Sequence, residues 1–203
     1  MAKVQGVKEK LHLPIYDAFF VPGVAPKETF NQTMTDPRMI RFFVDIQNKT
    51  KLETNLQAAG VLPSLNTFEA RAMRVVVSQI QNGTINPAIT DVSEVLADLI
   101  YNSVTTLLVG EKVMIEMPTF YFPSGAGVSP GTTEVINHGN PDPLATFRFA
   151  EPVFIEPQQN FRVEMLFPQG VPGQGSAIGK LATVKGPFRI WVVLDGYLTR
   201  DVQ

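Results

Sequence analysis

The stretch that decides the fold is Phe188-Arg-Ile-Trp-Val-Val-Leu-Asp-Gly-Tyr-Leu198, near the end of the chain. It is rich in aromatic and β-branched residues, with a dense apolar run over Ile190–Leu194, which is typical of a strand covered on both faces. Before it, Asn160–Phe167 alternates apolar and polar residues, the pattern of a half-buried strand. Two such strands joined by a long loop predict a β-sheet protein whose last strand lies inside the fold.

Five further segments carry strand signals, and two more are harder to assign. The five are Pro37–Ile46, Thr67–Ser78, Val104–Val109, Lys112–Met117 and Phe147–Ile155. Pro152 cannot donate a backbone hydrogen bond, so the last of these is expected at a sheet edge or with a bulge. Thr119–Phe122 is expected to continue an extended run, and Leu52–Leu62 fits either a weak strand or a short helix.

The alternation in Thr67–Ser78 predicts which side chains share a face. One face is expected to hold Phe68, Ala70, Ala72, Val75 and Val77, and the other Glu69, Arg71 and Met73. One helix is expected, over Asp91–Tyr101, because Asp91 can cap it and apolar residues follow at helical spacing. About eight strands, one short helix and no βαβ alternation predict an all-β protein. Its expected architecture is an antiparallel β-sandwich of the jelly-roll type.

The N-terminal segment differs from the rest in composition. Lys3, Lys8 and Lys10 make the start basic. Pro14 and Pro22 then interrupt the apolar stretch Leu11–Val24, and Pro26 follows it. Prolines at this spacing exclude a continuous helix. We therefore expect an extended arm over residues 1–36 and a β-sandwich domain over residues 37–203. The arm must lie either across a neighbouring subunit or on its own sheet.

The composition excludes several classes of function. The net charge of −2 gives no basic surface for nucleic acid, and the absence of cysteine excludes disulfides and thiolate chemistry. No apolar run is long enough for a membrane-spanning helix. The first ten residues lack the apolar core of a signal peptide, so folding in the cytoplasm is expected. Charged residues make up 18%, which fits either a surface partly buried against neighbours or a β protein rich in Thr, Asn, Gln and Pro.

No motif for catalysis, cofactor binding or metal binding emerges, so no site residues and no cofactor are assigned. His12 and His138 lack metal-ligand spacing, although Asp142 is close enough in sequence to orient His138. Gly170–Gly175 resembles a phosphate loop but is followed by no Gly-Lys-Ser/Thr. Asp195-Gly196 is interpreted as a hairpin turn or a bulge.

A sugar-cleaving site is the one catalytic alternative. Glu116 and Glu164 lie on expected strands, and facing carboxylates are what a glycosidase requires. Phe120 and Tyr121 are candidates for stacking on a sugar ring, whereas Trp191 is expected in the core. The other interpretation is that both glutamates occupy the solvent-facing half of their strands.

The whole pattern resembles the single jelly-roll structural proteins of icosahedral viruses and phages. The shared features are the basic-then-apolar start, about eight strands, one helix and the long loops Pro123–Pro143 and Pro168–Gly179. The closing region Phe147–Gln203 looks similar to the last strands of phage virion proteins. The chain departs from RNA-virus coats in lacking a strongly basic arm, which argues against direct neutralisation of a genome.

The resemblance implies a non-enzymatic capsid protein that assembles through sandwich edges, loops and the N-terminal arm. Its expected partners are copies of itself and other virion proteins, and its expected location is the virion. A trimeric decoration or tail protein is the nearest alternative. A carbohydrate-binding or glycoside-cleaving β-sandwich module is a further one.

Overall fold

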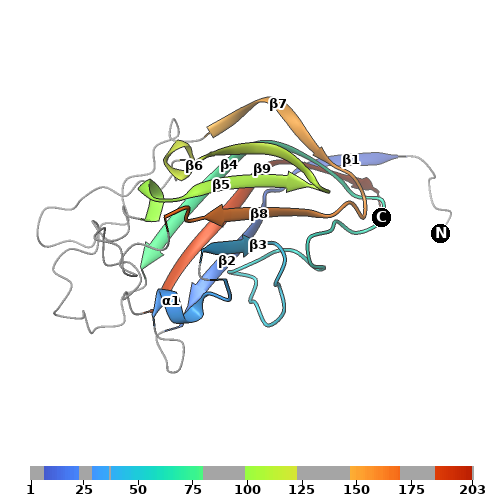
Figure 1. Cartoon of the computed structure of the whole chain (residues 1–203). Helices are drawn as coiled ribbons and strands as arrows, with labels where there is room; N and C mark the ends of the chain where they lie inside the picture. The colour runs from blue at the N-terminus through green and yellow to red at the C-terminus, as the bar shows by residue number, and fades with distance from the viewer. Residues whose placement is uncertain are drawn as a thin grey trace, which may run out of the picture.

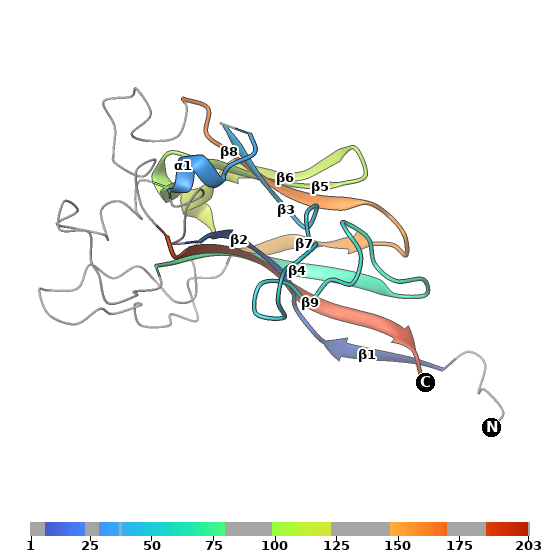
Figure 2. The same ribbon diagram turned by 90° about the horizontal axis from the view of Figure 1, so that it is seen from below.

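The chain folds into two antiparallel β-sheets packed face to face. The computed structural model describes residues 7–22, 29–36, 38–79, 99–122, 147–169 and 186–202, and Figure 2 shows the two layers edge-on. The first sheet contains β1 (Lys8–His12), β2 (Ile15–Val21), β4 (Thr67–Gln79), β7 (Phe147–Ile155) and β9 (Phe188–Asp201). The second contains β3 (Met39–Phe42), β5 (Val104–Val109), β6 (Lys112–Pro118) and β8 (Phe161–Leu166).

The order of the strands identifies the sandwich as a jelly roll. β1 and β2 both pair with β9, so they act as one first strand interrupted at Leu13 and Pro14. Counted this way, the first of eight strands pairs with the last, the second with the seventh, the third with the sixth and the fourth with the fifth. This pairing is that of one long antiparallel hairpin rolled into two sheets. A further strand pair joins the two halves of each sheet, β4 with β9 in the first sheet and β5 with β8 in the second. The predicted fold class is confirmed.

The core lies between the sheets and is formed largely by alternate residues of each strand. In β9, the inward side chains of Ile190, Val192 and Leu194 are buried. The outward side chains are half-buried, so the prediction that both faces of this strand are covered is wrong. Trp191 points outward, not into the core, and its indole N–H donates to the carbonyl of Leu52 at 3.1 Å.

A β-bulge in β4 changes which of its residues face inward. Ala70 pairs with Gly196 and Ala72 pairs with Asp195, which leaves Arg71 as the extra residue. Beyond the bulge the alternation shifts by one residue, so Met73 is fully buried although the sequence places it on the outer face. Asp195-Gly196 itself lies within β9, opposite this bulge. A Cβ on Gly196 would lie 2.0 Å from the carbonyl oxygen of Glu69, so this close approach requires glycine.

The remaining local expectations were met in part. β7 is an edge strand with a register shift opposite the β4 bulge, as Pro152 predicted. Thr119–Tyr121 forms a 3₁₀ turn, not an extended run, because Thr119 bonds back to Ser103 through both backbone and side chain. Leu52–Leu62 forms turns with one isolated bridge and contains neither a strand nor a helix.

Two short helical segments are described beside the strands. α1 (Phe30–Thr33) buries Phe30 in the core, and the sequence signals did not predict it. Of the helix expected over Asp91–Tyr101, residues 99–101 are described and are helical. The rest of that helix lies outside the described residues, as do Pro123–Pro143 and most of Pro168–Gly179.

The N-terminal segment takes the second of its two expected placements over residues 8–21. β1 and β2 add to the edge of the first sheet by pairing with β9, and Figure 1 shows both running beside it. Residues 1–6 and 23–28 lie outside the described residues, so an arm there stays a prediction.

A chain that lacks residues 1–30 is therefore expected to be unfolded. It would lose both strands on one side of β9 and the buried ring of Phe30. Circular dichroism with thermal melting would test this, with a chain starting at Val7 as the folded control. A cooperative melt of the shorter chain at the wild-type temperature would contradict this expectation.

One buried carboxylate ties β2 to the segment after β3. Asp17 is fully buried, and it accepts from the backbone N–H of Phe43 at 2.6 Å and from Lys49 Nζ at 2.8 Å. Phe43 has a φ of 69°, a conformation that this hydrogen bond helps to hold. Burial raises the pKa of Asp17, while the ammonium of Lys49 and the N–H of Phe43 favour its charged form.

Asp17→Ala is expected to lower the free energy of unfolding by about 3 kcal/mol, because it leaves the half-buried ammonium of Lys49 and the buried N–H of Phe43 without their acceptor. Urea denaturation measures the change. Asp17→Asn should cost less, since its amide oxygen can still accept from Phe43. Equal losses for the two variants would show that the hydrogen bond to Phe43 contributes little.

Candidate functional site

The outer face of the first sheet carries a network of charged side chains. Register places His12 of β1, Tyr197 of β9 and Glu69 of β4 directly opposite one another across three strands. Neighbouring positions add Lys10, Arg71, Arg74 and Asp195. This network joins β1, the first strand described, to the centre of the sheet.

Tyr197 lies at the centre of one half of the network. Its ring lies 4.8 Å from Lys10 Nζ and 5.0 Å from the guanidinium carbon of Arg71, both within cation–π range. Both cations also contact the carboxylate of Glu69. Hydrogen bonds from Lys10 and Arg71 lower the pKa of Glu69, against the smaller effect of its burial.

Asp195 organises the other half. It accepts from His12 Nε2 at 2.8 Å and from Arg74 Nη2 at 2.7 Å. Burial alone would raise the pKa of Asp195, but the bonds from His12 and Arg74 outweigh it, and the pKa is lowered. Exposed ion pairs contribute little stability individually, so the network mainly fixes how β1 lies on the sheet.

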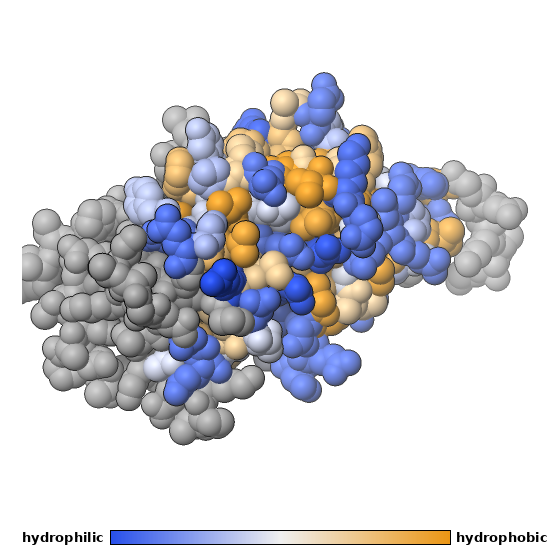
Figure 3. All heavy atoms as spheres, in the orientation of Figure 1, coloured by the Kyte–Doolittle hydropathy of each residue, from blue (hydrophilic) through white to orange (hydrophobic). Residues whose placement is uncertain are grey.

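The outer face of the second sheet contains an open hollow of about 300 Å³. Arg41 of β3 pairs across the strands with Glu164 of β8, and Arg162 lies two residues before Glu164 on the same face. Arg162 Nε donates to Glu164 at 2.8 Å, whereas Arg41 Nε is 3.9 Å from the same oxygen. The bond to Glu164 raises the pKa of Arg162. In Figure 3, which looks onto this sheet, hydrophilic and hydrophobic residues are interspersed.

The structure places the two predicted glutamates on the same sheet but not in contact. Glu116 and Glu164 each pair with Thr106, so the middle strand β5 separates them. Two strand spacings correspond to roughly 10 Å between their backbones. One oxygen of Glu164, Oε1, already accepts from Arg162 Nε. This geometry does not favour the sugar-cleaving alternative.

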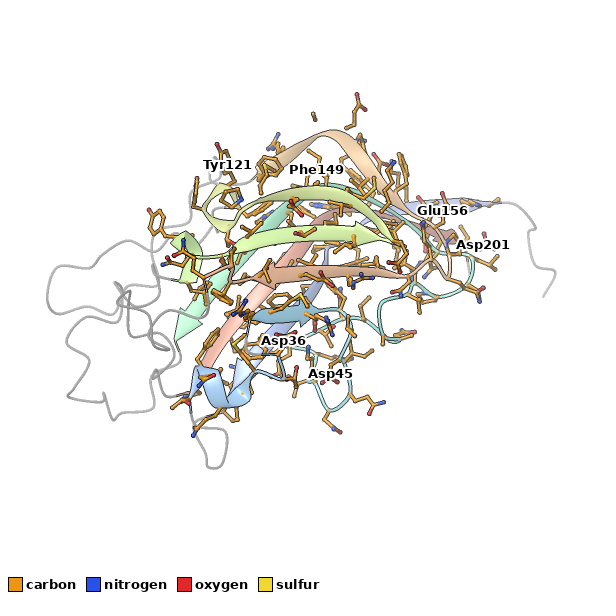
Figure 4. All side chains as sticks on the ribbon, viewed as in Figure 1. Asp36, Asp45, Tyr121, Phe149, Glu156 and Asp201 are labelled. Atoms are coloured by element: carbon orange, nitrogen blue, oxygen red, sulfur yellow. The ribbon has the colours of Figure 1, made fainter. Side chains whose placement is uncertain are left out.

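Exposed apolar side chains gather at both ends of the sandwich. Tyr101, Phe120 and Tyr121 are in ring contact at one end, with centroids 6.2 Å and 5.0 Å apart. Figure 4 shows Tyr121 at this end, opposite Glu156 and Asp201. At the other end, β1 and the last part of β9 project beyond the second sheet (Figure 2) and carry exposed Val7 and Val202, with exposed Leu65 just before β4.

Three of the edge strands, β1, β6 and β7, carry features that oppose strand addition. β7 has Pro152 and a bulge, and β6 has a bulge at Met114, because Leu107 and Leu108 pair with Ile115 and Val113. β1 carries three charged residues in succession, Lys8, Glu9 and Lys10. Bulges, proline and charge are the features that prevent edge-to-edge pairing.

These surfaces were hard to anticipate from sequence patterns. His12 was assigned no role, but its hydrogen bond with Asp195 joins residues 183 positions apart. Only the alternation of charged residues in β1 and β4 hinted at a polar outer face. His138, Asp142 and Gly170–Gly175 lie outside the described residues.

Comparison with known proteins identified no relatives: no family model, curated protein or solved structure matches this chain. In the part of the chain that the structure describes, no three His, Asp or Glu side chains are grouped so as to hold a metal ion. No helix among those residues is long and apolar enough to cross a membrane.

The two lowered pKa values predict loss of stability in acid. The contribution of Glu69 and Asp195 is fully present above pH about 4.3, where these groups are ionised even in the unfolded chain. It is lost as the pH falls through their lower folded-state pKa values. In urea unfolding at pH 7 and pH 3, the double variant Glu69→Gln, Asp195→Asn should lose less stability on acidification than wild type. Glu151→Gln, an exposed change on β7, should lose as much as wild type; an equally steep loss in the double variant would contradict this assignment.

Proposed function

We propose that this chain is a structural virion protein, a capsid protein that assembles with copies of itself. The observation that carries the proposal is the jelly-roll strand order, an architecture that viral shells use repeatedly. A rigid sandwich of this kind presents fixed surfaces, and many weak contacts between identical copies add up to a stable assembly.

The exposed surfaces favour contacts through the ends of the sandwich. The aromatic end (Tyr101, Phe120 and Tyr121) and the projecting end (Val7, Leu65 and Val202) each expose apolar side chains. Aromatic and apolar residues are the usual centre of protein interfaces. The bulges in β6 and β7 argue against assembly by strand addition at those two edges. Contact of one end with the other end of a neighbour is heterologous, and such a contact builds a closed ring when its rotation closes and an open filament when it does not.

Light scattering across a concentration series tests the proposal. The expected mass is several times that of one chain, and its multiple separates a shell unit from a trimeric decoration or tail protein. Leu65→Ser at the projecting end should reduce the mass, because its side chain is 63% exposed where a neighbour would bury it. A monomer at every concentration would contradict the proposal.

Leu52→Ser is the matched control for this experiment. Leu52 is 60% exposed but lies in the loop that contacts Trp191, away from both ends. The substitution removes the same side chain at nearly the same exposure as Leu65→Ser. Because Leu52 lies away from both ends, the mass of the assembly should not change. If Leu52→Ser reduces the mass as much as Leu65→Ser, the interface does not lie at the ends.

A further inference from the structure

The hollow on the second sheet has unused hydrogen-bond donors. A guanidinium carries five N–H donors, and Arg162 uses its Nε on Glu164. Arg41 approaches Glu164 no closer than 3.9 Å, which is too long for a hydrogen bond. Among the described residues, no other carboxylate lies within 4.0 Å of either guanidinium. The guanidinium of Arg41, whose side chain is 54% exposed, is therefore available to a ligand.

The wall opposite the arginines is held in place by the backbone. Gly60 has a φ of 61°, and a Cβ there would lie 2.7 Å from Asn160 Oδ1. The carbonyl of Gly60 accepts from Phe161 N–H at 2.7 Å, and the carbonyl of Asn160 accepts from Gly110 N–H at 2.6 Å. These bonds fix the backbone of Asn160 at the border of the hollow. A preformed wall lowers the entropy lost when a ligand binds.

The charge and the size of the hollow limit what it can hold. The lining holds two guanidiniums and one carboxylate, and a second carboxylate, Glu111, also acts on Arg162. This small positive charge matches a monoanion better than a dianion. Planar carboxylates fit the fork of an arginine. A volume of about 300 Å³ is at the small end for ligand sites. Val44 and Ala59 add apolar wall, and the amide of Asn160 can bond to a hydroxyl.

We propose that this hollow binds a small monocarboxylate that also carries hydroxyl groups, of the sugar-acid class. The carboxylate lies between Arg41 and Arg162, and a hydroxyl bonds to Asn160. Glu164 orients Arg162 and repels ligands of higher negative charge. The site does not depend on the assembly proposed above, because all of its residues come from one chain.

Saturation-transfer NMR with sodium D-glucuronate, at constant ionic strength, tests the proposal on the full chain. Saturable transfer to the glucuronate protons is expected, with none to glucose and with weaker binding of acetate. Arg41→Gln should weaken binding about ten-fold, the usual effect of removing one charged hydrogen bond. Arg148→Gln, the same charge change on exposed β7 of the other sheet, should leave binding unchanged.

Several outcomes would overturn the proposal. They are absence of saturable transfer, equal binding of glucose, unchanged binding in Arg41→Gln, or stronger displacement of glucuronate by inorganic phosphate than by acetate. Light scattering on the same samples shows whether the natural occupant of the hollow is a free ligand or a carboxylate side chain of a neighbouring copy. A fall in particle mass on addition of glucuronate would assign the hollow to a neighbour's side chain and reject the small-ligand proposal.

Discussion

The fold depends on the hydrogen bonds that β9 makes along both of its edges. β1 and β2 pair with it on one side, and β4 pairs with it on the other over nearly its whole length. The inward residues of β9 also form the floor of the core, from Ile190 to Leu198. Removing either set of bonds would expose backbone groups and apolar surface together. Gly196 shows how tight the constraint is, because no side chain fits against Glu69 there.

Strand positions and fold class were predictable because period-2 patterns and turn residues are local properties of the sequence. The errors arose where a long-range contact decides the local structure. Met73 is buried because a bulge opposite Gly196 shifts the alternation. Thr119 ends the extended run because Ser103 lies beside it in the fold. Trp191 faces outward because it alternates with the inward residues Ile190 and Val192, and the carbonyl of Leu52 satisfies its indole N–H there.

The candidate surfaces were harder to predict than the fold. The outer-face network joins β1 to strands that begin far along the chain, and no motif marks such a pairing. The hollow depends on three separate segments, near Arg41, Gly60 and Arg162. Glu116 and Glu164, the two glutamates considered for sugar cleavage, do lie on the second sheet. Glu164, however, lies beside Arg41 and Arg162 and accepts a hydrogen bond from Arg162. The charge of a residue in the sequence did not distinguish a pair of facing glutamates from a glutamate paired with arginines, because charge does not show which strands become neighbours.

The pairing of the first strands with the last also determines when the protein can fold. Ribosomes add about 5–20 residues per second, so β1 and β2 wait roughly 10 to 30 s before their partner β9 is synthesised. Until then their apolar side chains stay exposed, because their contacts with β9 join residues that are far apart in the sequence and form late. During this interval the unpaired strands are prone to aggregate with other unfinished chains, as slow-folding β-topologies generally are.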